Sequence, residues 1–224
     1  MSRPLRTTVL VSGSGSNLQA LIDARDAGLP IEIVHVISNV PGARGLERAR
    51  QAGIETSVLE HGAFAERADF DRALALLIAA GQPELVVLAG FMRIVGPAVV
   101  EPFRGRMINL HPSLLPRYRG TNTYQRAIDA GDREHGASIH FVTEELDGGP
   151  VISQVVIPLL PGDDAATLAA RLGPMEHRLV VATVELLATG RVECSDEPRD
   201  EYVLFDGRRL ARPLRLQADD RLAA

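Results

Sequence analysis

Short apolar segments alternate with amphipathic segments through the first half of the chain, and this alternation limits the possible folds more than any other feature. The apolar segments are continuous, which is typical of strands buried on both faces of a parallel sheet. The spacing i, i+3, i+4, i+7, i+8 of a helix is followed by Phe70, Ala73, Leu74, Leu77 and Ile78. Strands are predicted over residues 7–11, 31–37, 56–59, 85–89 and 107–110. Strands that alternate with helices predict right-handed βαβ units, and therefore an α/β fold with helices on both faces of the sheet.

The second half of the chain has a different pattern. Residues 137–142 and 151–157 are predicted to form adjacent strands joined by a structured loop. A long helix is expected from about Asp164. The Gly173-Pro174 pair inside it predicts a kink or a break, because proline removes a backbone donor and clashes with the preceding turn. We expect a single domain over residues 1–190, followed by a C-terminal tail over 191–224.

The tail carries the signal of a hairpin. Asp206-Gly207 separates the apolar segment 202–205 from residues 208–210. Asp-Gly is a preferred dipeptide for the tight turn between two antiparallel strands. We therefore expect a short β-hairpin in the tail, and a frayed end from Gln217 onward.

Composition argues against several classes of function. The 224 residues include no Trp and 4% aromatic residues, which disfavours stacking on single-stranded nucleic acid. The formal net charge of -5 disfavours a polyanionic partner, although a local pocket for one phosphate is allowed. A single cysteine, Cys194, allows neither an intramolecular disulfide nor a cysteine-based zinc site. The longest apolar run, 85–92, is too short to cross a bilayer, so we expect a cytoplasmic protein without membrane or nucleic-acid partners.

A loop rich in glycine and serine, residues 12–17, follows the first predicted strand and precedes a helix; we call it the glycine loop. Its glycines allow the backbone to approach a ligand, and free N–H groups at the start of a helix favour an anion. The loop lacks the third glycine of a dinucleotide-binding motif and the Lys of a Walker loop. A turn without a ligand explains the same residues equally well, so both interpretations stay open.

Asn109 and His111 form a second candidate site. Alternate residues of a strand point to the same face, so both side chains are expected to project from the carboxyl end of a buried strand, where open α/β sheets bind ligands. The alternative is a structural His beside an Asn that caps a turn. Asp147, which precedes two glycines, is either a turn former or a carboxylate that orients His111. The other histidines lack metal-ligand spacing and are interpreted as structural or surface residues: His35, His61, His135, His140 and His177.

Six motifs together resemble the folate-dependent formyltransferase family. In chain order they are GSGSN at 13–17, GLERAR at 45–50, AGFMRI at 89–94, NLHPSLLP at 109–116, HGASIHFV at 135–142 and ELDGG at 145–149. The resemblance extends over residues 7–190. It implies a Rossmann-like, three-layer formyltransferase fold, with a mostly parallel central sheet and antiparallel strands in the C-terminal half.

The resemblance also implies an activity. Family members with these motifs transfer the formyl group of 10-formyltetrahydrofolate to the amine of glycinamide ribonucleotide (GAR) in de novo purine (IMP) biosynthesis. The amine attacks directly, through a tetrahedral intermediate. The implied co-substrate is 10-formyltetrahydrofolate, no metal is needed, and the partners are small-molecule substrates. Whether the enzyme is a monomer or a homodimer stays open.

Individual residues take their expected roles from the matching motif positions. The catalytic residues are expected to be Asn109, His111 and Asp147. The residues expected to bind GAR are Gly15, Ser16, Asn17 and Glu176. The residues expected to bind the folate are Arg67, Met92, Arg93, Ile94, Val95, Asn109, Thr143, Glu144, Glu145, Leu146 and Asp147. In these roles Asn109 and a protonated His111 stabilise the oxyanion, while Asp147 keeps His111 charged and accepts the proton of the amine through water.

The chain departs from the family pattern in two places. Residues 121–124, Thr-Asn-Thr-Tyr, replace a stretch that contains histidine in some members, and Gly173-Pro174 makes the placement of Glu176 uncertain.

Three alternative functions are considered. A formyltetrahydrofolate deformylase uses water as the acceptor, which leaves the glycine loop without a purpose. A methionyl-tRNA formyltransferase needs a further RNA-binding domain, whereas 34 residues follow Gly190. A non-enzymatic nucleotide-binding module explains the loop but not the three predicted catalytic residues.

Overall fold

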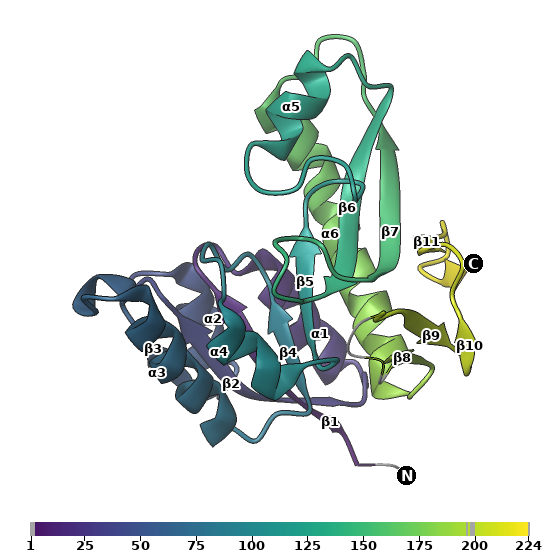
Figure 1. Ribbon diagram of the computed structural model, residues 1–224. Helices are drawn as coiled ribbons and strands as arrows, with labels where there is room; N and C mark the ends of the chain where they lie inside the picture. The colour runs from purple at the N-terminus through teal and green to yellow at the C-terminus, as the bar shows by residue number, and fades with distance from the viewer. Residues whose placement is uncertain (1–2, 196, 198–199, 224) are drawn as a thin grey trace. The chain divides into compact units, whose positions relative to one another are not determined.

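The computed structural model describes residues 3–195, 197 and 200–223. Contacts among these residues divide the chain into two compact units, the first ending at Asn109 and the second beginning at Leu110. Every strand pair of the first unit is parallel, whereas the second unit contains the antiparallel pairs (Figure 1).

Five parallel strands form the sheet of the first unit. They are β1 (Leu5–Val11), β2 (Ile31–Ser38), β3 (Thr56–Val58), β4 (Leu85–Leu88) and β5 (Met107–His111). Their order is β3-β2-β1-β4-β5. Because the strands are parallel, their carboxyl ends lie at one edge of the sheet, and Leu88 at the end of β4 pairs with Asn109. The parallel sheet predicted from the continuous apolar runs is confirmed.

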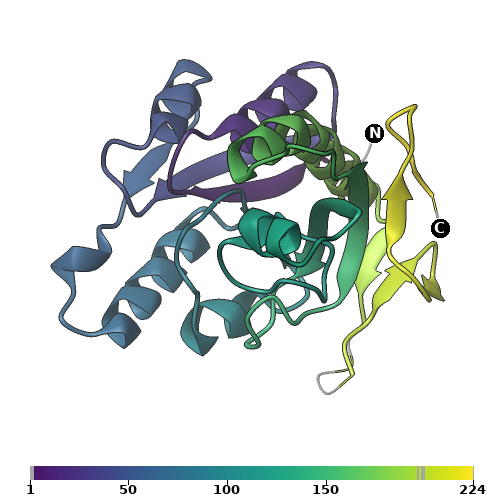
Figure 2. The ribbon, with the colours of Figure 1, turned by 90° about the horizontal axis from the view of Figure 1, so that it is seen from above.

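Helices cover both faces of this sheet. The longer ones are α1 (Ser16–Asp26), α2 (Arg44–Gln51) and α3 (Arg67–Ala80), and the short ones are α4 (Pro97–Val100), η1 (His61–Ala63) and η2 (Glu101–Phe103). In Figure 2, α1 and α2 lie on one side of the strands, and α3 and α4 lie on the other. Leu10, Leu18, Leu21, Leu74 and Ile78 are completely buried between these layers. The predicted three-layer arrangement with an aliphatic core is therefore present in this unit.

The second unit combines one long helix with a mixed sheet. Its elements are α5 (Thr123–Asp129), β6 (Glu134–Phe141), β7 (Val151–Pro158), α6 (Ala165–Ala188), β8 (Val192–Cys194), β9 (Val203–Phe205), β10 (Arg208–Arg209), β11 (Leu214–Leu216) and β12 (Leu222–Ala223). β6 and β7 are antiparallel, as expected, and β11 runs parallel to β7. None of the described helices is both long and apolar enough to cross a membrane.

The hairpin predicted for the tail is confirmed. β9 and β10 are antiparallel, with Phe205 paired to Arg208 across the turn. Asp206 and Gly207 have φ values of 49° and 74°. A tight turn with positive φ at both central residues matches the right-handed twist of the strands, which explains why Asp-Gly is found there.

The Gly173-Pro174 pair does not break the long helix, and the alternative of a kink there stays a prediction. α6 continues through Pro174 for 24 residues. Its start is fixed by a capping box in which Asp164 and Thr167 exchange hydrogen bonds of 2.8 and 2.9 Å. Leu172 before the proline and Leu179 after it are fully buried. Each buried leucine contributes about 1.5–3 kcal/mol, so packing on both sides offsets the roughly 3 kcal/mol cost of an internal proline.

The expected fraying from Gln217 onward is also wrong for the described residues. β12 pairs with β11 through Leu216 and Leu222, and the backbone N–H of Gln217 donates to Arg221 at 2.8 Å. A closed hairpin satisfies these backbone groups, and Leu214 of β11 is completely buried beside β7. The division into a domain over 1–190 and a tail over 191–224 stays a prediction.

Candidate active site

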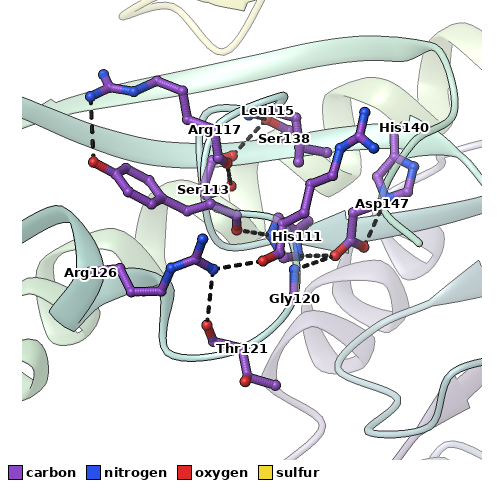
Figure 3. A network of polar contacts seen from close by, with 12 residues as sticks. His111, Ser113, Leu115, Arg117, Gly120, Thr121, Arg126, Ser138, His140 and Asp147 are labelled. Atoms are coloured by element: carbon purple, nitrogen blue, oxygen red, sulfur yellow. Dashed lines mark hydrogen bonds and ion pairs between the residues drawn. The ribbon is translucent and has the colours of Figure 1, made fainter. Parts of the chain in front are cut away.

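His111 ends β5 with a buried imidazole whose two nitrogens face different partners. Nε2 donates to the backbone carbonyl of Tyr118 at 2.9 Å, and Nδ1 lies 3.5 Å from Oδ2 of Asp147 (Figure 3). A carbonyl oxygen only accepts hydrogen bonds, so Nε2 carries the proton of the neutral ring. Nδ1 is therefore the atom at which His111 takes up or releases a proton.

Asp147 presents a buried carboxylate from the loop between β6 and β7. Its side chain is 8% exposed, and the backbone N–H of Gly120 donates to Oδ2 at 2.8 Å. The loop closes tightly after it: a Cβ atom on Gly149 would lie 2.0 Å from the carbonyl oxygen of Phe141. Glycine at 149 is thus required for the backbone path that directs Asp147 inward.

His140, the next-to-last residue of β6, is the second histidine at this carboxylate. Its side chain is 2% exposed, and Nε2 lies 3.6 Å from Oδ1 of Asp147. Nδ1 bonds to the carbonyl of Phe141 at 2.8 Å, and Nε2 is the nitrogen that faces Asp147. We call His111, His140 and Asp147 the histidine–aspartate cluster. An added proton at Nδ1 of His111 creates a buried ion pair with Asp147.

Burial and charge oppose each other in this cluster. Burial lowers the pKa of His111, and this effect exceeds the raising effects of the Tyr118 carbonyl and the Asp147 charge. Burial alone raises the pKa of Asp147. Hydrogen bonds from His140 and Gly120, together with electrostatic interactions with His111 and His140, lower it by more, so the net pKa is below its usual value. Lost solvation thus outweighs the attraction of Asp147 in setting the pKa of His111, and the expectation that Asp147 keeps His111 charged stays a prediction.

The loop over residues 112–122, which follows His111, is fixed by buried polar side chains. Ser138 of β6 donates to the carbonyl of Ser113 at 2.6 Å and accepts from the N–H of Leu115 at 3.0 Å. Gln154 of β7 donates to the carbonyl of Leu115 at 2.9 Å. Both side chains come from rigid strands, so they hold the loop that supplies the Tyr118 carbonyl to His111.

Asn109 lies two residues before His111 on β5 and is half-buried. Alternate residues of a strand share a side, so the amide of Asn109 and the imidazole of His111 leave β5 on the same side. As predicted from the sequence, both residues lie at the carboxyl end of a strand.

The glycine loop joins β1 to α1 and is braced by α2. Gly15 has a φ of 67°, and a Cβ atom on it would lie 2.5 Å from Cα of Gly45. The N–H of Gly45 donates to the carbonyl of Gly13 at 3.1 Å, and Nε of Arg48 donates to the carbonyl of Ser14 at 2.9 Å. Glycine at 15 thus serves both a left-handed conformation and a close backbone contact.

The start of α1 directs backbone donors out of this loop. Ser16 and Asn17 begin the helix, so their N–H groups have no acceptor within it, and no described side chain caps them. The buried Oδ1 of Asn17 also has no hydrogen-bond partner within the described part of the chain. Backbone donors and the positive end of the helix dipole suit an anion such as a phosphate.

Ser12 ties the carboxyl ends of three strands together. Its Oγ donates to Oδ1 of Asn39, which follows β2, and accepts from the N–H of Met92, which follows β4, at 2.7 Å. The backbone N–H of Ser12 donates to the carbonyl of Gly90 at 3.1 Å. The segment with the predicted folate residues 92–95 is therefore anchored to the glycine loop.

Arg67 lies beside the 92–95 segment. Its Nη2 donates to the carbonyl of Ile94 at 3.0 Å. Met92 is 75% exposed and Ile94 is 54% exposed, so both residues offer apolar surface. Arg93 is half-buried and Val95 is buried.

The remaining predicted residues lie in the second unit. In the loop that carries Asp147, Thr143 is half-buried, and the exposed residues are Glu144, Glu145 and Leu146. Glu145 forms an ion pair with Arg119. Glu176 is half-buried on α6. No group of three possible metal ligands occurs among the residues described.

Comparisons with known proteins identify the family to which the chain is similar. Residues 5–184 match the formyl transferase family. The chain is 46% identical over 207 residues to phosphoribosylglycinamide formyltransferase of Escherichia coli K12, covering 92% of this chain and 96% of that protein. It is 40% identical over 208 residues to the protein of the same name from Haemophilus influenzae, covering 92% and 96%. The solved structure of phosphoribosylglycinamide formyltransferase from Coxiella burnetii matches with a TM-score of 0.87 and 46% identity, covering 93% of this chain and 97% of that one.

The chain belongs to the formyl transferase family. The family resemblance stated from the six motifs is thereby confirmed, and so is the formyltransferase fold. As a formyl transferase, it requires a folate-derived formyl donor and small-molecule substrates.

In this formyl transferase, sequence reasoning missed three groups that contact His111 or Asp147. The sequence indicates a structural or surface role for His140, whereas the structure places its Nε2 beside Asp147. The Gly120 amide and the Tyr118 carbonyl carry no side-chain signal at all. For His140 a signal existed, because the end of β6 leads directly into the loop that bears Asp147.

Proposed function

We propose that this formyl transferase moves the formyl group of 10-formyltetrahydrofolate to the amine of glycinamide ribonucleotide, a step of de novo purine biosynthesis. The relatives at 40–46% identity carry the corresponding name over nearly their whole length, which supports this acceptor over water. The observation that carries the chemistry is the buried pair of Asp147 and His111, whose Oδ2 and Nδ1 atoms lie 3.5 Å apart.

The first step needs a donor for the developing oxyanion. The amine of the ribonucleotide attacks the formyl carbon, and the carbonyl oxygen becomes an alkoxide. The amide N–H of Asn109 donates to this oxygen from the end of β5. A preorganised donor of this kind contributes about 2.7–4 kcal/mol to the stability of the transition state.

The second step moves a proton between the two nitrogens. The attacking nitrogen carries a positive charge after addition and releases a proton, through water, to Nδ1 of His111. Asp147 stabilises the imidazolium that forms. The same proton then passes to N10 of the folate as the bond from carbon to N10 breaks, so no net proton is gained or lost. A histidine with a lowered pKa suits this role, because it starts neutral and returns the proton readily.

The binding roles divide between backbone and side-chain groups. The phosphate of the ribonucleotide binds to the amides of Gly15, Ser16 and Asn17, and Glu176 accepts hydrogen bonds from its donors. The folate ring contacts the exposed apolar side chains of residues 92–95, and the loop over 143–147 contacts the same substrate. Arg67 attracts the acidic tail of the folate.

Several expectations from the sequence stay predictions. These are the cytoplasmic location, the choice between monomer and homodimer, and a reaction without metal, nucleic acid or membrane. Dependence on 10-formyltetrahydrofolate itself, rather than on another formylated folate, is part of the proposal.

The test is an assay of the purified chain with 10-formyltetrahydrofolate, with and without the ribonucleotide. Release of tetrahydrofolate and formylation of the ribonucleotide are measured together, the second by mass spectrometry. We expect equal amounts of both products, and release of tetrahydrofolate only when the ribonucleotide is present. Release at the same rate without the ribonucleotide would assign the chain to the deformylases instead.

A further inference from the structure

Asp71 is a buried residue of α3 whose carboxylate the proposed mechanism does not use. The residue is 5% exposed, and its Oδ1 atom has no hydrogen-bond partner within the described part of the chain. A buried polar oxygen without a partner costs free energy, because it loses its hydrogen bonds to water and gains none in return. An apolar side chain of similar volume would avoid this cost. A role other than stability is therefore expected for the carboxylate.

The other oxygen of this carboxylate, Oδ2, faces Arg67, one turn earlier on α3. It lies 3.7 Å from Nε of Arg67, and the arginine side chain is 53% exposed, whereas that of Asp71 is 7% exposed. Nη2 of Arg67 donates to the carbonyl of Ile94 at 3.0 Å. The guanidinium is thus held by contacts at Nε and Nη2. Arginine has five N–H donors, so this arrangement leaves others for a ligand.

Gly96 allows the same carboxylate to lie against the end of the 92–95 segment. Gly96 precedes α4, which packs against α3 (Figure 2). A Cβ atom on Gly96 would overlap Oδ2 of Asp71. The φ of Gly96 is −94°, which other residues also adopt, so close approach rather than backbone conformation requires glycine here. α3 therefore places one buried oxygen beside both Arg67 and the segment with the predicted folate residues.

We infer that Asp71 is a positioning residue that orients Arg67 toward the acidic tail of the formyl donor. The inference rests on the proposed function, in which Arg67 attracts that tail. A free arginine side chain samples many rotamers, and ordering it before binding removes that cost from the affinity. Asp71 also offsets the charge of Arg67, but the arginine is largely exposed, so water and salt already screen this charge. Orientation therefore outweighs the lost attraction.

The tail is a separable part of the formyl donor, and this gives the inference a selective readout. 10-Formyltetrahydropteroate has the same ring system and formyl group but lacks the glutamate tail. Asp71 acts through Arg67 on the tail alone, so its removal matters for the complete donor and not for the truncated one. A general distortion of the site would affect both donors.

The test measures kcat and KM with both donors in wild type, Asp71→Asn, Arg67→Ala and the double variant. We expect Asp71→Asn to raise the KM for 10-formyltetrahydrofolate roughly 3- to 10-fold, the range for one long side chain that has to be ordered on binding. The kcat and the KM values for the truncated donor and the ribonucleotide are expected to stay within about twofold of wild type. Arg67→Ala is expected to raise the KM for the complete donor at least ~10-fold. Added to Arg67→Ala, Asp71→Asn is expected to cause no further rise.

Asp69→Asn is the matched control. Asp69 lies on the same helix and also forms an ion pair with an arginine, Arg72, but both side chains are exposed and neither residue belongs to the proposed site. We expect this control to leave all KM values unchanged. Asp71→Ser removes the buried charge with a smaller side chain beside Gly96, and we expect it to show the same selective rise in KM as Asp71→Asn.

Thermal unfolding separates a positioning role from a structural one. Asp71→Asn removes a buried charge and leaves the exposed charge of Arg67, so no uncompensated charge stays buried. We therefore expect the Tm of Asp71→Asn to equal or exceed that of wild type. A residue needed only for the packing of α3 on α4 would lower the Tm when it is replaced.

Four results would overturn the inference. The first is an unchanged KM for the complete donor in both Asp71→Asn and Asp71→Ser, and the second is a further rise in the double variant. The third is an equal rise for both donors together with a lower Tm, which indicates a purely structural aspartate. The fourth is an unchanged KM in Arg67→Ala, which also removes Arg67 from the proposed donor site. The proposed function fails separately, if wild-type protein releases tetrahydrofolate without the ribonucleotide.

Discussion

The histidine–aspartate cluster and the glycine loop present their functional groups in different ways. In the cluster, ionisable side chains are withdrawn from water, and each is held by a backbone group: the Tyr118 carbonyl, the Phe141 carbonyl or the Gly120 amide. In the glycine loop the functional groups are backbone N–H groups, which carry no formal charge and do not titrate in the range where proteins are folded. The first arrangement suits proton transfer, and the second suits the recognition of an anion.

This difference predicts different kinetic signatures. Changing a group that moves a proton affects the transition state, so kcat falls. Changing the surroundings of backbone donors affects the bound substrate and the transition state alike, so mainly KM rises. The variants below separate the two regions by this criterion.

The largest effect is expected in the cluster. We expect His111→Ala and Asp147→Asn each to lower kcat at least ~100-fold, because the first removes the proton carrier and the second removes the charge that stabilises its protonated form. Steady-state kinetics with both substrates measure this effect. His61→Ala and Asp26→Asn, at exposed positions, are the controls. Near-normal turnover in either cluster variant would remove that residue from the mechanism.

A backbone change near the cluster is expected to have the next largest effect. Gly149→Ala places a methyl group 2.0 Å from the Phe141 carbonyl, so the loop must move and carry Asp147 with it. We expect kcat to fall roughly 10- to 100-fold and the free energy of unfolding to fall by about 1–3 kcal/mol. Gly62→Ala is the control, because nothing lies within 4 Å of its added Cβ. Normal kcat with a lowered Tm would show that Asp147 tolerates the displacement.

The sequence predicted more of the glycine loop and β5 than of the cluster, for a physical reason. Apolar runs mark where buried strands end, so the exit points of Asn109, His111 and the glycine loop followed from local patterns. The contact between His140 and Asp147 depends on how the loop after β6 folds back, which local patterns do not encode. The charge state of His111 depends on how many residues exclude water from it, and that is a property of the packed fold.

At two places tertiary packing outweighs a local signal of the sequence. Pro174 is a local signal for a helix break, yet packing of residues far apart in the sequence kept α6 continuous. The polar end of the chain is a local signal for fraying, yet Leu214 of β11 pairs with β7, and β12 pairs with β11 in a hairpin. In both cases a tertiary contact outweighed a propensity of the chain.

The glycine loop is expected to respond to charge rather than to shape. Ser16→Asp places a carboxylate at the start of α1, where it repels the phosphate of the ribonucleotide. We expect the KM for the ribonucleotide to rise roughly 10-fold, the equivalent of about 1.4 kcal/mol, with little change in kcat or in the KM for the formyl donor. Ser16→Asn, which has the same shape without the charge, is the control. An equal rise in both variants would indicate a steric effect, and no rise in Ser16→Asp would place the phosphate elsewhere.

The smallest expected effect is a dependence of the unfolding free energy on pH. It distinguishes the cluster from the glycine loop, because of these two regions only the cluster contains side chains that titrate. The pKa of His111 is lowered in the folded protein, whereas the unfolded chain binds a proton near pH 6.5. Acidification below pH 6.5 therefore favours the unfolded chain, and the stability gained from the neutral ring, complete above that pH, is lost as the pH falls toward the folded pKa. Asp147, whose pKa is also lowered, loses its contribution only below its ordinary value of 3.8.

Urea unfolding of the wild type and of His111→Asn is measured between pH 7.5 and 5. The difference between the two proteins gives the contribution of His111 to the pH dependence of the unfolding free energy. For one histidine this slope cannot exceed about 1.4 kcal/mol per pH unit. We expect a shallower slope in His111→Asn and an unchanged slope in Ser16→Asn. His35 and His135 also have pKa values lowered by burial, so part of the slope persists in the variant. The slope, unlike the absolute stability, does not depend on packing lost at position 111. Equal slopes in wild type and His111→Asn would therefore mean that His111 is not held neutral by the fold, and proton uptake at Nδ1 would no longer distinguish the cluster from the loop.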